Sequence, residues 1–449
     1  MPDLSAVIAA NRFGQGAAPG ELSLVSNDPR GWLLAQLAPQ PLPPQLAGLP
    51  GSAQSAQRFA ELKAVRRADK TGTLPDPAEE KAKAEMRALY TTEAAARTRL
   101  AVETQTPFYE RLVQFWSNHF AVSTARFEVA HLAGSFEREA IRPHVAGRFS
   151  QMLLAAMRHP AMLAYLDNAT SIGPDSQAGL RQKRGLNENL AREMMELHTL
   201  GVDGGYSQDD VQQLARVLTG WTIGNEKDGL TGQFLYQPRF HEPGPKAFLQ
   251  VTIPESGETE ALRAVDILTH HPATARFIAT KLARHFIADD PPPAAVEALA
   301  KAFRESGGDL ALVCKTLVER PEPWKTPLSK MKTSNDYVVS TLRLLAGPEL
   351  DDNAILRPLN LLGQPPFAAP SPAGWPDRAE AWMGPEVLMR RIEWARDLAK
   401  KLHRIDLLEL AAEGLGPLMD GPLRQALLNA TDAAEATLLL LSCPQFQRR

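Results

Sequence analysis

The side chains of this sequence best suited to chemistry are two glutamates in one polar segment. Glu193 and Glu196 lie within the stretch from Asn187 to Trp221, and their three-residue spacing places both carboxylates on one face of a helix. A poorly solvated carboxylate can act as a general acid or base, and it can also bind a divalent metal ion. The segment therefore suggests an acid–base or metal-assisted hydrolytic site, with a divalent metal as one candidate cofactor.

A helix through this stretch separates polar from apolar side chains. At about 100° per residue, Asn189 and Arg192 join the two glutamates on one arc, and His198 projects from the opposite, apolar arc. In one interpretation the polar arc faces solvent, and Arg192 pairs with carboxylates four residues away. In the other, the arc lines a cleft in which Asn189 and Arg192 bind substrate. The helical pattern alone favours the first interpretation.

A third catalytic candidate, His119, lies on the apolar face of a helix expected from Phe108 to Val122. Apolar residues precede it by three, four and seven positions, so its imidazole is expected to be buried. A buried imidazole must find a hydrogen-bond partner, and such a histidine is usually structural. The alternative is that His119 reaches His198 or a carboxylate and completes a metal or proton-transfer site.

Three further side chains are expected to bind substrate. The turn from His241 to Lys246, with sequence HEPGPK, presents an imidazole and an ammonium group from a rigid loop. Polar groups on a loop held by proline and glycine are good candidates for ligand contact, so His241 and Lys246 join Asn189 and Arg192. Trp221 could form the floor of a pocket, although a core position is more typical of tryptophan.

The composition excludes several classes of protein. The formal net charge is −3 and no basic stripe is present, which argues against a nucleic-acid partner and against a polybasic membrane-surface protein. Cys314 and Cys443 lie far apart in apolar runs, which predicts buried thiols. The first twenty residues lack the features of a signal peptide, and we expect no membrane span. The cytoplasm is the default location, and export together with a partner that carries a signal stays open.

The elements expected to position these residues are helices. Abundant Ala, Leu, Arg and Glu, with apolar residues spaced by three and four, predict an all-α protein with a large multi-helix globular body. A helix is expected over Glu137–Met157, and the Pro-rich stretch Pro39–Pro50 is expected to be a loop. An irregular stretch near residues 222–253 is the one place where strands are expected, as a small β-hairpin insertion around Gln233–Tyr236.

The chain is expected to divide into three helical parts. They are an N-terminal region over residues 1–100, a central domain with the polar segments over residues 101–290, and a C-terminal region over residues 291–449 packed on the core. The connector Gly363–Trp382 is rich in Pro and Trp. It is too apolar for a free loop and is expected to pack over the helical body.

Several blocks of the sequence together resemble one protein family. They are FWSNHF (115–120), HPAMLAYLDN (159–168), NENLAREMMELHTLGVDGGYSQDDVQQLARVLTGW (187–221), HEPGPK (241–246), HPATARFIATKLARHF (271–286) and the connector around Gly374, Trp375 and Pro376. In this order they span most of the chain from about Leu100 onward, and they resemble the bacterial domain-of-unknown-function 1800 (DUF1800) family.

The resemblance implies a helical fold without an established activity. It also implies a partner, because members are often encoded beside a sulfatase-like family, DUF1501, whose members tend to carry twin-arginine-type export signals. His198 departs from the family pattern, since many relatives have Phe there, and this supports a core position for His198.

Two hypotheses of different kinds therefore remain. The first is an enzyme that uses Glu193 or Glu196 as base or ligand, His119 or His241 as the second group, and Arg192 or Lys246 to bind an anionic substrate. The second is a non-catalytic partner or scaffold of a sulfatase-like, DUF1501-type protein, with the polar cluster as a structural network. A cleft with poorly solvated carboxylates would favour the enzyme, and an exposed apolar patch near Trp375 and Trp382 would favour the scaffold.

Overall fold

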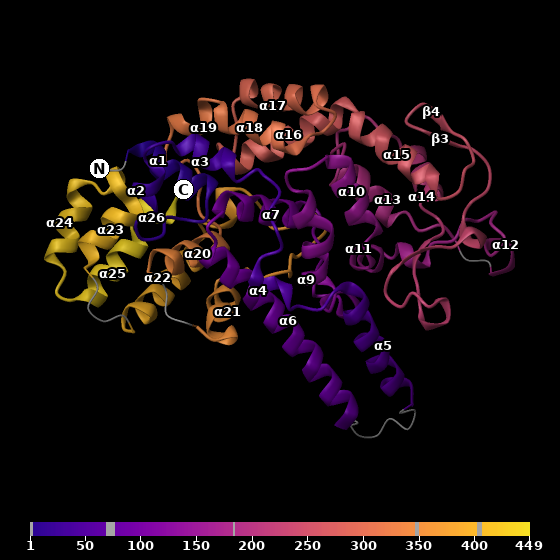
Figure 1. The fold of residues 1–449 in the computed structure, drawn as a ribbon, viewed down its shortest axis with the longest axis horizontal. Helices are drawn as coiled ribbons and strands as arrows, with labels where there is room; N and C mark the ends of the chain where they lie inside the picture. Colours follow the sequence, from indigo (N-terminus) through magenta and orange to yellow (C-terminus); the bar gives the residue numbers. More distant parts are fainter. Residues whose placement is uncertain (1–2, 69–76, 183–184, 346–349, 402–405) are drawn as a thin grey trace.

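The computed structural model describes residues 3–68, 77–182, 185–345, 350–401 and 406–449. Most of them are helical (Figure 1), which confirms the predicted all-α class. The longer helices of the first half are α5 (Ser52–Ala68), α6 (Pro77–Glu103), α7 (Pro107–His119), α10 (Phe149–Arg158), α13 (Asn189–Glu196) and α14 (Gln208–Val217). Those of the second half are α15 (Thr259–His270), α16 (Pro272–Phe286), α17 (Pro293–Glu305), α18 (Leu310–Glu319), α20 (Ser334–Leu344), α21 (Asp352–Leu361), α22 (Pro385–Ala399), α23 (Leu407–Leu415), α24 (Gly421–Asn429) and α25 (Ala433–Ser442).

The strands of the described chain form two small antiparallel pairs within the predicted irregular stretch. Strand β1 (Trp221–Ile223) pairs with β2 (Phe234–Tyr236), with Trp221 opposite Tyr236. Strand β3 (Lys246–Phe248) pairs with β4 (Val251–Ile253). The predicted hairpin insertion near residues 222–253 is therefore confirmed, and the stretch contains a second hairpin beyond the predicted one.

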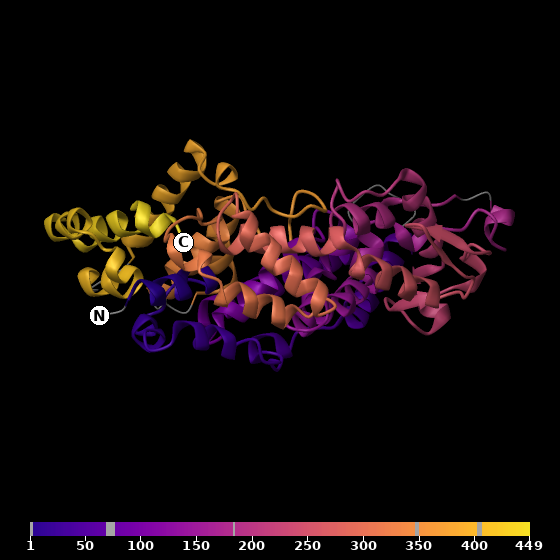
Figure 2. The same cartoon turned by 90° about the horizontal axis from the view of Figure 1, so that it is seen from above.

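The helices build an elongated body (Figures 1 and 2). Helices α23–α25 form one end, and β3, β4 and α14 lie at the other, while α5 and α6 project together from the side. The larger hydrophobic core joins N-terminal residues 4–37 with residues 108–318, and a smaller one draws mainly on α20–α25 with Ala94 and Ala95 of α6. The predicted limits of the three domains stay a prediction.

Local sequence signals explain where several helices begin. Ser207 caps α14, accepting from the backbone N–H of Asp210, whose carboxylate accepts from the Ser207 N–H in return. His159 and His271 each precede a proline that starts a helix, and the Nδ1 of each ring accepts a backbone N–H two residues later. The two histidines thus cap helices, and the four-residue sequence signal around Ser207 acts as a capping box.

Two expected boundaries differ from the structure. The single helix expected over Glu137–Met157 is interrupted: a π-helical turn over Glu137–Ile141 passes into a 3-10 turn over Arg142–His144 before α10 begins. Pro143 lies in the 3-10 turn, and its ring has no N–H to donate to the carbonyl four residues earlier, as a continuous α-helix would require. The expected Pro-rich loop contains a short helix, α4 (Pro44–Ala47), because a proline fits the first turn of a helix.

The connector Gly363–Trp382 lies against the helical body, as its apolar composition predicted. The backbone N–H of Thr124 donates to the Phe367 carbonyl at 2.8 Å, and the Tyr90 hydroxyl donates to the Pro366 carbonyl at 3.0 Å. Asn118 of α7 bonds to both the N–H and the carbonyl of Trp375, at 2.7 and 2.9 Å. Gly374 has φ +82° and a Cβ there would overlap the Asn118 carbonyl, so this contact requires glycine.

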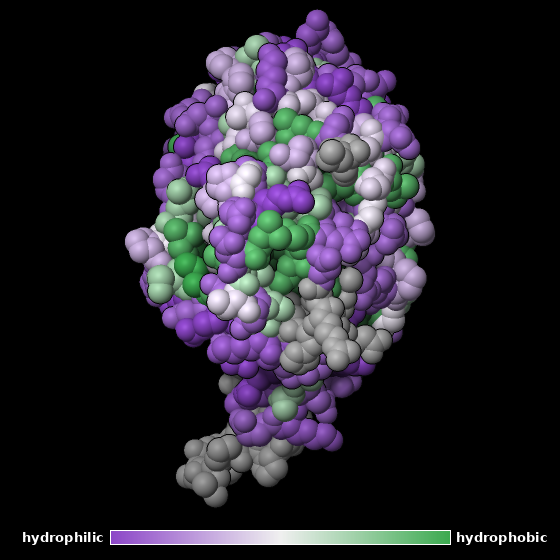
Figure 3. All heavy atoms as spheres, turned by 90° about the vertical axis from the view of Figure 1, so that its left-hand side faces the viewer, coloured by the Kyte–Doolittle hydropathy of each residue, from purple (hydrophilic) through white to green (hydrophobic). Residues whose placement is uncertain are grey.

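Both cysteines are free and buried, as the sequence predicted. Figure 3 shows the end of the molecule that carries α23–α25, where hydrophobic side chains form separate groups within a largely hydrophilic surface. Among the described residues, no helix has both the length and the apolar character needed to cross a membrane.

Candidate ligand-binding site

On the polar arc of α13, Arg192 pairs with carboxylates four residues away, as expected if the arc faces solvent. Arg192 lies 3.0 Å from a Glu188 oxygen and 3.4 Å from a Glu196 oxygen, four residues to either side. Glu193 and Glu196 are half-buried, whereas Asn189 is exposed. Partial burial and the neighbouring Glu196 carboxylate raise the pKa of Glu193, against the opposing charge of Arg192.

His119 is buried between α7 and the end of the α13 segment. Its Nε2 donates to the carbonyl of His198 at 3.0 Å, and its Nδ1 makes no hydrogen bond within the part of the chain that the structure describes. Burial, together with the positive charge of Lys281, holds the pKa of His119 well below its usual value, so the ring is neutral near pH 7. His119 therefore reaches His198 through the backbone, while the two rings lie 5.8 Å apart, centroid to centroid.

His198 occupies a core position. It is 0% exposed, its ring centroid lies 5.1 Å from that of Phe120, and neither ring nitrogen makes a hydrogen bond to the described residues. Burial lowers the pKa of His198 to about 3. This environment suits an aromatic hydrocarbon better than an imidazole.

His241 and Lys246 belong to a buried network built around Glu260 of α15. Glu260 is 0% exposed, and its carboxylate lies 3.0 Å from His241 Nε2 and 2.8 Å from Lys246 Nζ. The backbone N–H groups of Ser256 and Gly257 also donate to it, at 3.0 and 3.1 Å. Burial opposes ionisation of Glu260, yet the hydrogen bonds from Lys246 and the backbone hold its pKa below the usual value.

Trp221 lies in the main core. It is 1% exposed, and the guanidinium of Arg158 lies over its ring at 5.2 Å from the centroid. Trp221 thus packs inside the protein at the start of β1. A core position was the more typical of its two expected roles, the other being the floor of a pocket.

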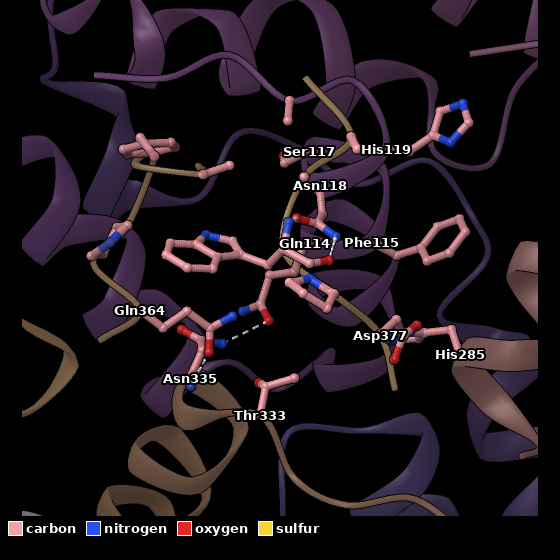
Figure 4. A pocket seen from close by; sticks show the side chains of 18 of the residues that line it. Gln114, Phe115, Ser117, Asn118, His119, His285, Thr333, Asn335, Gln364 and Asp377 are labelled. Carbon is pink, nitrogen blue, oxygen red and sulfur yellow. Dashed lines mark hydrogen bonds and ion pairs between the residues drawn. The ribbon is translucent and has the colours of Figure 1, made fainter. Parts of the chain in front are cut away.

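A cavity of about 570 Å³ lies under the connector. It is enclosed by α7, the C-terminal half of α16, the start of α20 and residues 364–378 of the connector, and Figure 4 shows it from close by. Its apolar walls come from Phe115, Phe136, Phe367, Trp375 and four connector prolines. This size and mixed lining are typical of a small-molecule site.

Among the described residues that line this cavity, His119 is the one sequence-predicted candidate. In Figure 4 its ring points away from the group of amide side chains. Glu193 and Glu196 lie on α13, and His241 and Lys246 lie in the Glu260 network. The structure therefore places the candidates in three separate surroundings and does not bring them together.

Most charged groups around the cavity have a hydrogen-bonded or ion-pair partner within the protein. Arg97 pairs with Glu137 at 2.7 Å, and Arg111 pairs with Asp336 at 2.9 Å. Asp377 pairs with His285 at 2.7 Å, and although burial opposes its ionisation, His285 and Lys330 hold its pKa well below the usual range. Burial lowers the pKa of His285 itself to about 4 despite this partner.

Two cations at the cavity wall have no such partner. Lys281 and Arg284, three residues apart on α16, both line the cavity and make no ion pair with the described acidic residues. The Nε of Arg284 donates to the Asp289 carbonyl at 3.2 Å, which leaves its terminal amino groups for another acceptor. After internal pairing, the cavity therefore carries an excess of positive charge.

Amide side chains provide neutral donors on the facing wall. The Gln114 side-chain oxygen accepts from Asn335 at 3.2 Å, and the Gln364 side-chain oxygen accepts from the Asn335 backbone N–H at 2.7 Å (Figure 4). The amide nitrogens of Gln114 and Gln364 make no hydrogen bond to the described residues. Such groups can donate to a bound ligand.

Residues 8–448 match the family described as "Protein of unknown function (DUF1800)". The chain belongs to the DUF1800 family. No curated protein and no solved structure matches it. Among the described residues of this DUF1800 chain, no three His, Cys, Asp or Glu side chains gather into a group that could hold a metal ion.

Sequence reasoning missed the unpaired cations of this DUF1800 chain. Lys281 and Arg284 lie within the block HPATARFIATKLARHF. Its pattern is typical of an ordinary amphipathic helix and does not by itself indicate a binding site. Their spacing on one helix face was available as a signal. Only the packing of α16 against the connector shows that neither cation has a carboxylate partner among the described residues.

Proposed function

We propose that this protein binds a small organic anion in the cavity under the connector. The observation that carries the proposal is the pair Lys281 and Arg284, which line the cavity without a carboxylate partner among the described residues. A guanidinium presents a planar fork that matches a carboxylate or phosphate. The aromatic and proline side chains of the walls favour an organic ligand over an inorganic ion.

Binding of citrate at constant ionic strength tests this function. Citrate should raise the thermal unfolding midpoint of the wild-type protein above that in chloride, because it binds the folded state. R284Q and K281M should each weaken the affinity by about 10- to 100-fold, the equivalent of one charge-assisted hydrogen bond. The matched control is R276Q, which removes an exposed cation from the same helix and should leave the affinity unchanged.

The result that refutes the proposal is equally definite. Citrate affinity that is equal in wild type and R284Q, or no stabilisation by citrate at all, would show that the two cations are not an anion site.

An acid–base role for Glu193 is a second candidate function. Its raised pKa supports the role, because a general acid or base works best with a pKa closer to neutrality. Hydrolysis at Glu193 and Glu196 would require a substrate at α13 and would be independent of the anion site.

The scaffold function remains a proposal on the family resemblance. Three exposed apolar side chains on or beside α22, Met383, Met389 and Ile392, support it. A sulfatase-like, DUF1501-type partner should co-purify with the wild-type protein, and monomeric behaviour in its presence would count against this role. Residence in the cytoplasm, or export with such a partner, is part of the same proposal.

A further inference from the structure

Lys281 is half-buried, and it differs from the fully buried lysines of the described chain in what neutralises its charge. Lys246 lies 2.8 Å from Glu260, and Lys330 lies 3.2 Å from Asp377. Lys332 donates to the Ser340 hydroxyl at 2.9 Å and lies over the Phe446 ring, away from the cavity. Lys281 differs from all three, because it borders the cavity and has no carboxylate or hydroxyl partner among the described residues.

The surroundings of Lys281 keep its amine free for an incoming molecule. Its ammonium group lies 5.5 Å from the centroid of the Phe277 ring, on its own helix. Asp377, an acid that lines the same cavity, is already held by His285 and Lys330. His119 and His198, on the other side, are neutral and offer no negative charge.

Burial and the charge of Arg284, opposed by Asp377, lower the pKa of Lys281 to about 8. With its pKa lowered in this way, Lys281 has a much larger unprotonated fraction near neutral pH than an ordinary lysine. The neutral amine is the nucleophilic form, so Lys281 is activated in the way that imine-forming lysines require.

We propose that Lys281 is a nucleophile that forms an imine with the carbonyl carbon of a small oxo acid, whose carboxylate binds Arg284. The geometry supports this pairing because residues three apart on a helix lie on one face, with Cβ atoms about 5–6 Å apart. The inference depends on the anion site proposed above and adds to it the class of ligand and a covalent step.

The step balances without an added oxidant or reductant. The lone pair of the neutral Lys281 nitrogen attacks the carbonyl carbon, and one amine proton moves to the former carbonyl oxygen to give a neutral carbinolamine. The hydroxyl group takes one proton from solvent and leaves as water, and the nitrogen lone pair forms the carbon–nitrogen double bond of a protonated imine. The imine nitrogen carries a positive charge when protonated, and the carboxylate held by Arg284 balances it.

Reductive trapping tests the inference on the full chain. The protein is incubated with glyoxylate and cyanoborohydride at pH 7.5, and the labelled lysines are identified by peptide mass spectrometry. Lys281 should be carboxymethylated at least about tenfold faster than the exposed Lys301, because of its larger neutral fraction. Its labelling rate should level off above about pH 8, whereas that of Lys301 should still rise.

Two comparisons separate this inference from the anion site. K281R keeps the positive charge and should keep citrate stabilisation, while preferential labelling in the α16 peptide disappears. Citrate should protect Lys281 of the wild-type protein from glyoxylate. Stabilisation by citrate with Lys281 labelled no faster than Lys301 would overturn the imine alone. Fast labelling of Lys281 without citrate stabilisation would overturn the anion site and leave the reactive lysine.

Discussion

The substitution E260Q probes whether His241 and Lys246 are held by a structural network. Glu260 lies 2.8 Å from the Lys246 ammonium and 3.0 Å from His241 Nε2, accepts hydrogen bonds from two backbone N–H groups, and is 0% exposed. Glutamine retains one acceptor oxygen with nearly the same shape. It cannot neutralise Lys246, which is 1% exposed and would then be a buried cation without an anion.

The magnitude follows from that unpaired charge. Removing one partner of a buried ion pair typically costs about 3–5 kcal/mol of folding free energy, and we expect a loss in this range. The double variant K246M/E260Q removes both charges and fills the same space. It should recover most of the loss, leaving about 1 kcal/mol for the Glu242 carbonyl, which accepts from Lys246 at 2.6 Å.

Urea unfolding, followed by far-UV circular dichroism, measures these differences. The matched control is D266N on the same helix, because Asp266 pairs with Arg263 at 2.7 Å in an exposed position and should contribute at most about 1 kcal/mol. The pKa of Glu260 is lowered in the folded state, so its contribution is present above its ordinary value of 4.5 and is lost as the pH falls. The free energies of unfolding of wild type and E260Q should therefore approach each other as the pH falls below 4.5.

Two outcomes would refute the structural role. If E260Q loses less than 1 kcal/mol of folding free energy, Lys246 is not a buried ammonium that depends on the Glu260 carboxylate. A double variant no more stable than E260Q would mean that the loss does not arise from the unpaired ammonium.

Two other predictions concern the predicted polar segment. H198F should raise the free energy of unfolding by about 1 kcal/mol or more, because it removes two buried ring nitrogens that have no partners among the described residues. Urea unfolding measures this change. A loss of stability would indicate that the His198 ring has a polar partner. Glu193 should titrate above 4.5 by carbon-13 NMR of its carboxyl, and E196Q should lower its pKa by removing the like charge, so that an unchanged value would contradict the assigned cause.

The sequence by itself determined the helical class, the place of the strands and many helix starts. These features depend on signals within a few residues: apolar spacing along α7 and α14, the capping box at Ser207, and the prolines after His159 and His271. It also indicated that the connector would pack over the helical body, because its composition is unsuited to a free loop. Interactions between residues close in sequence were therefore enough to predict these features.

Only the tertiary structure decided which charges have partners. The sequence predicted a ligand-binding role for Lys246 and none for Lys281. Glu260 lies fourteen residues beyond Lys246 and neutralises it, whereas folding leaves Lys281 facing a cavity without a carboxylate partner among the described residues. Charge pairing depends on distances of a few ångströms between distant segments, and helical spacing carries no information on them. For this reason the two glutamates of α13 were found from the sequence, and the two cations of α16 were not.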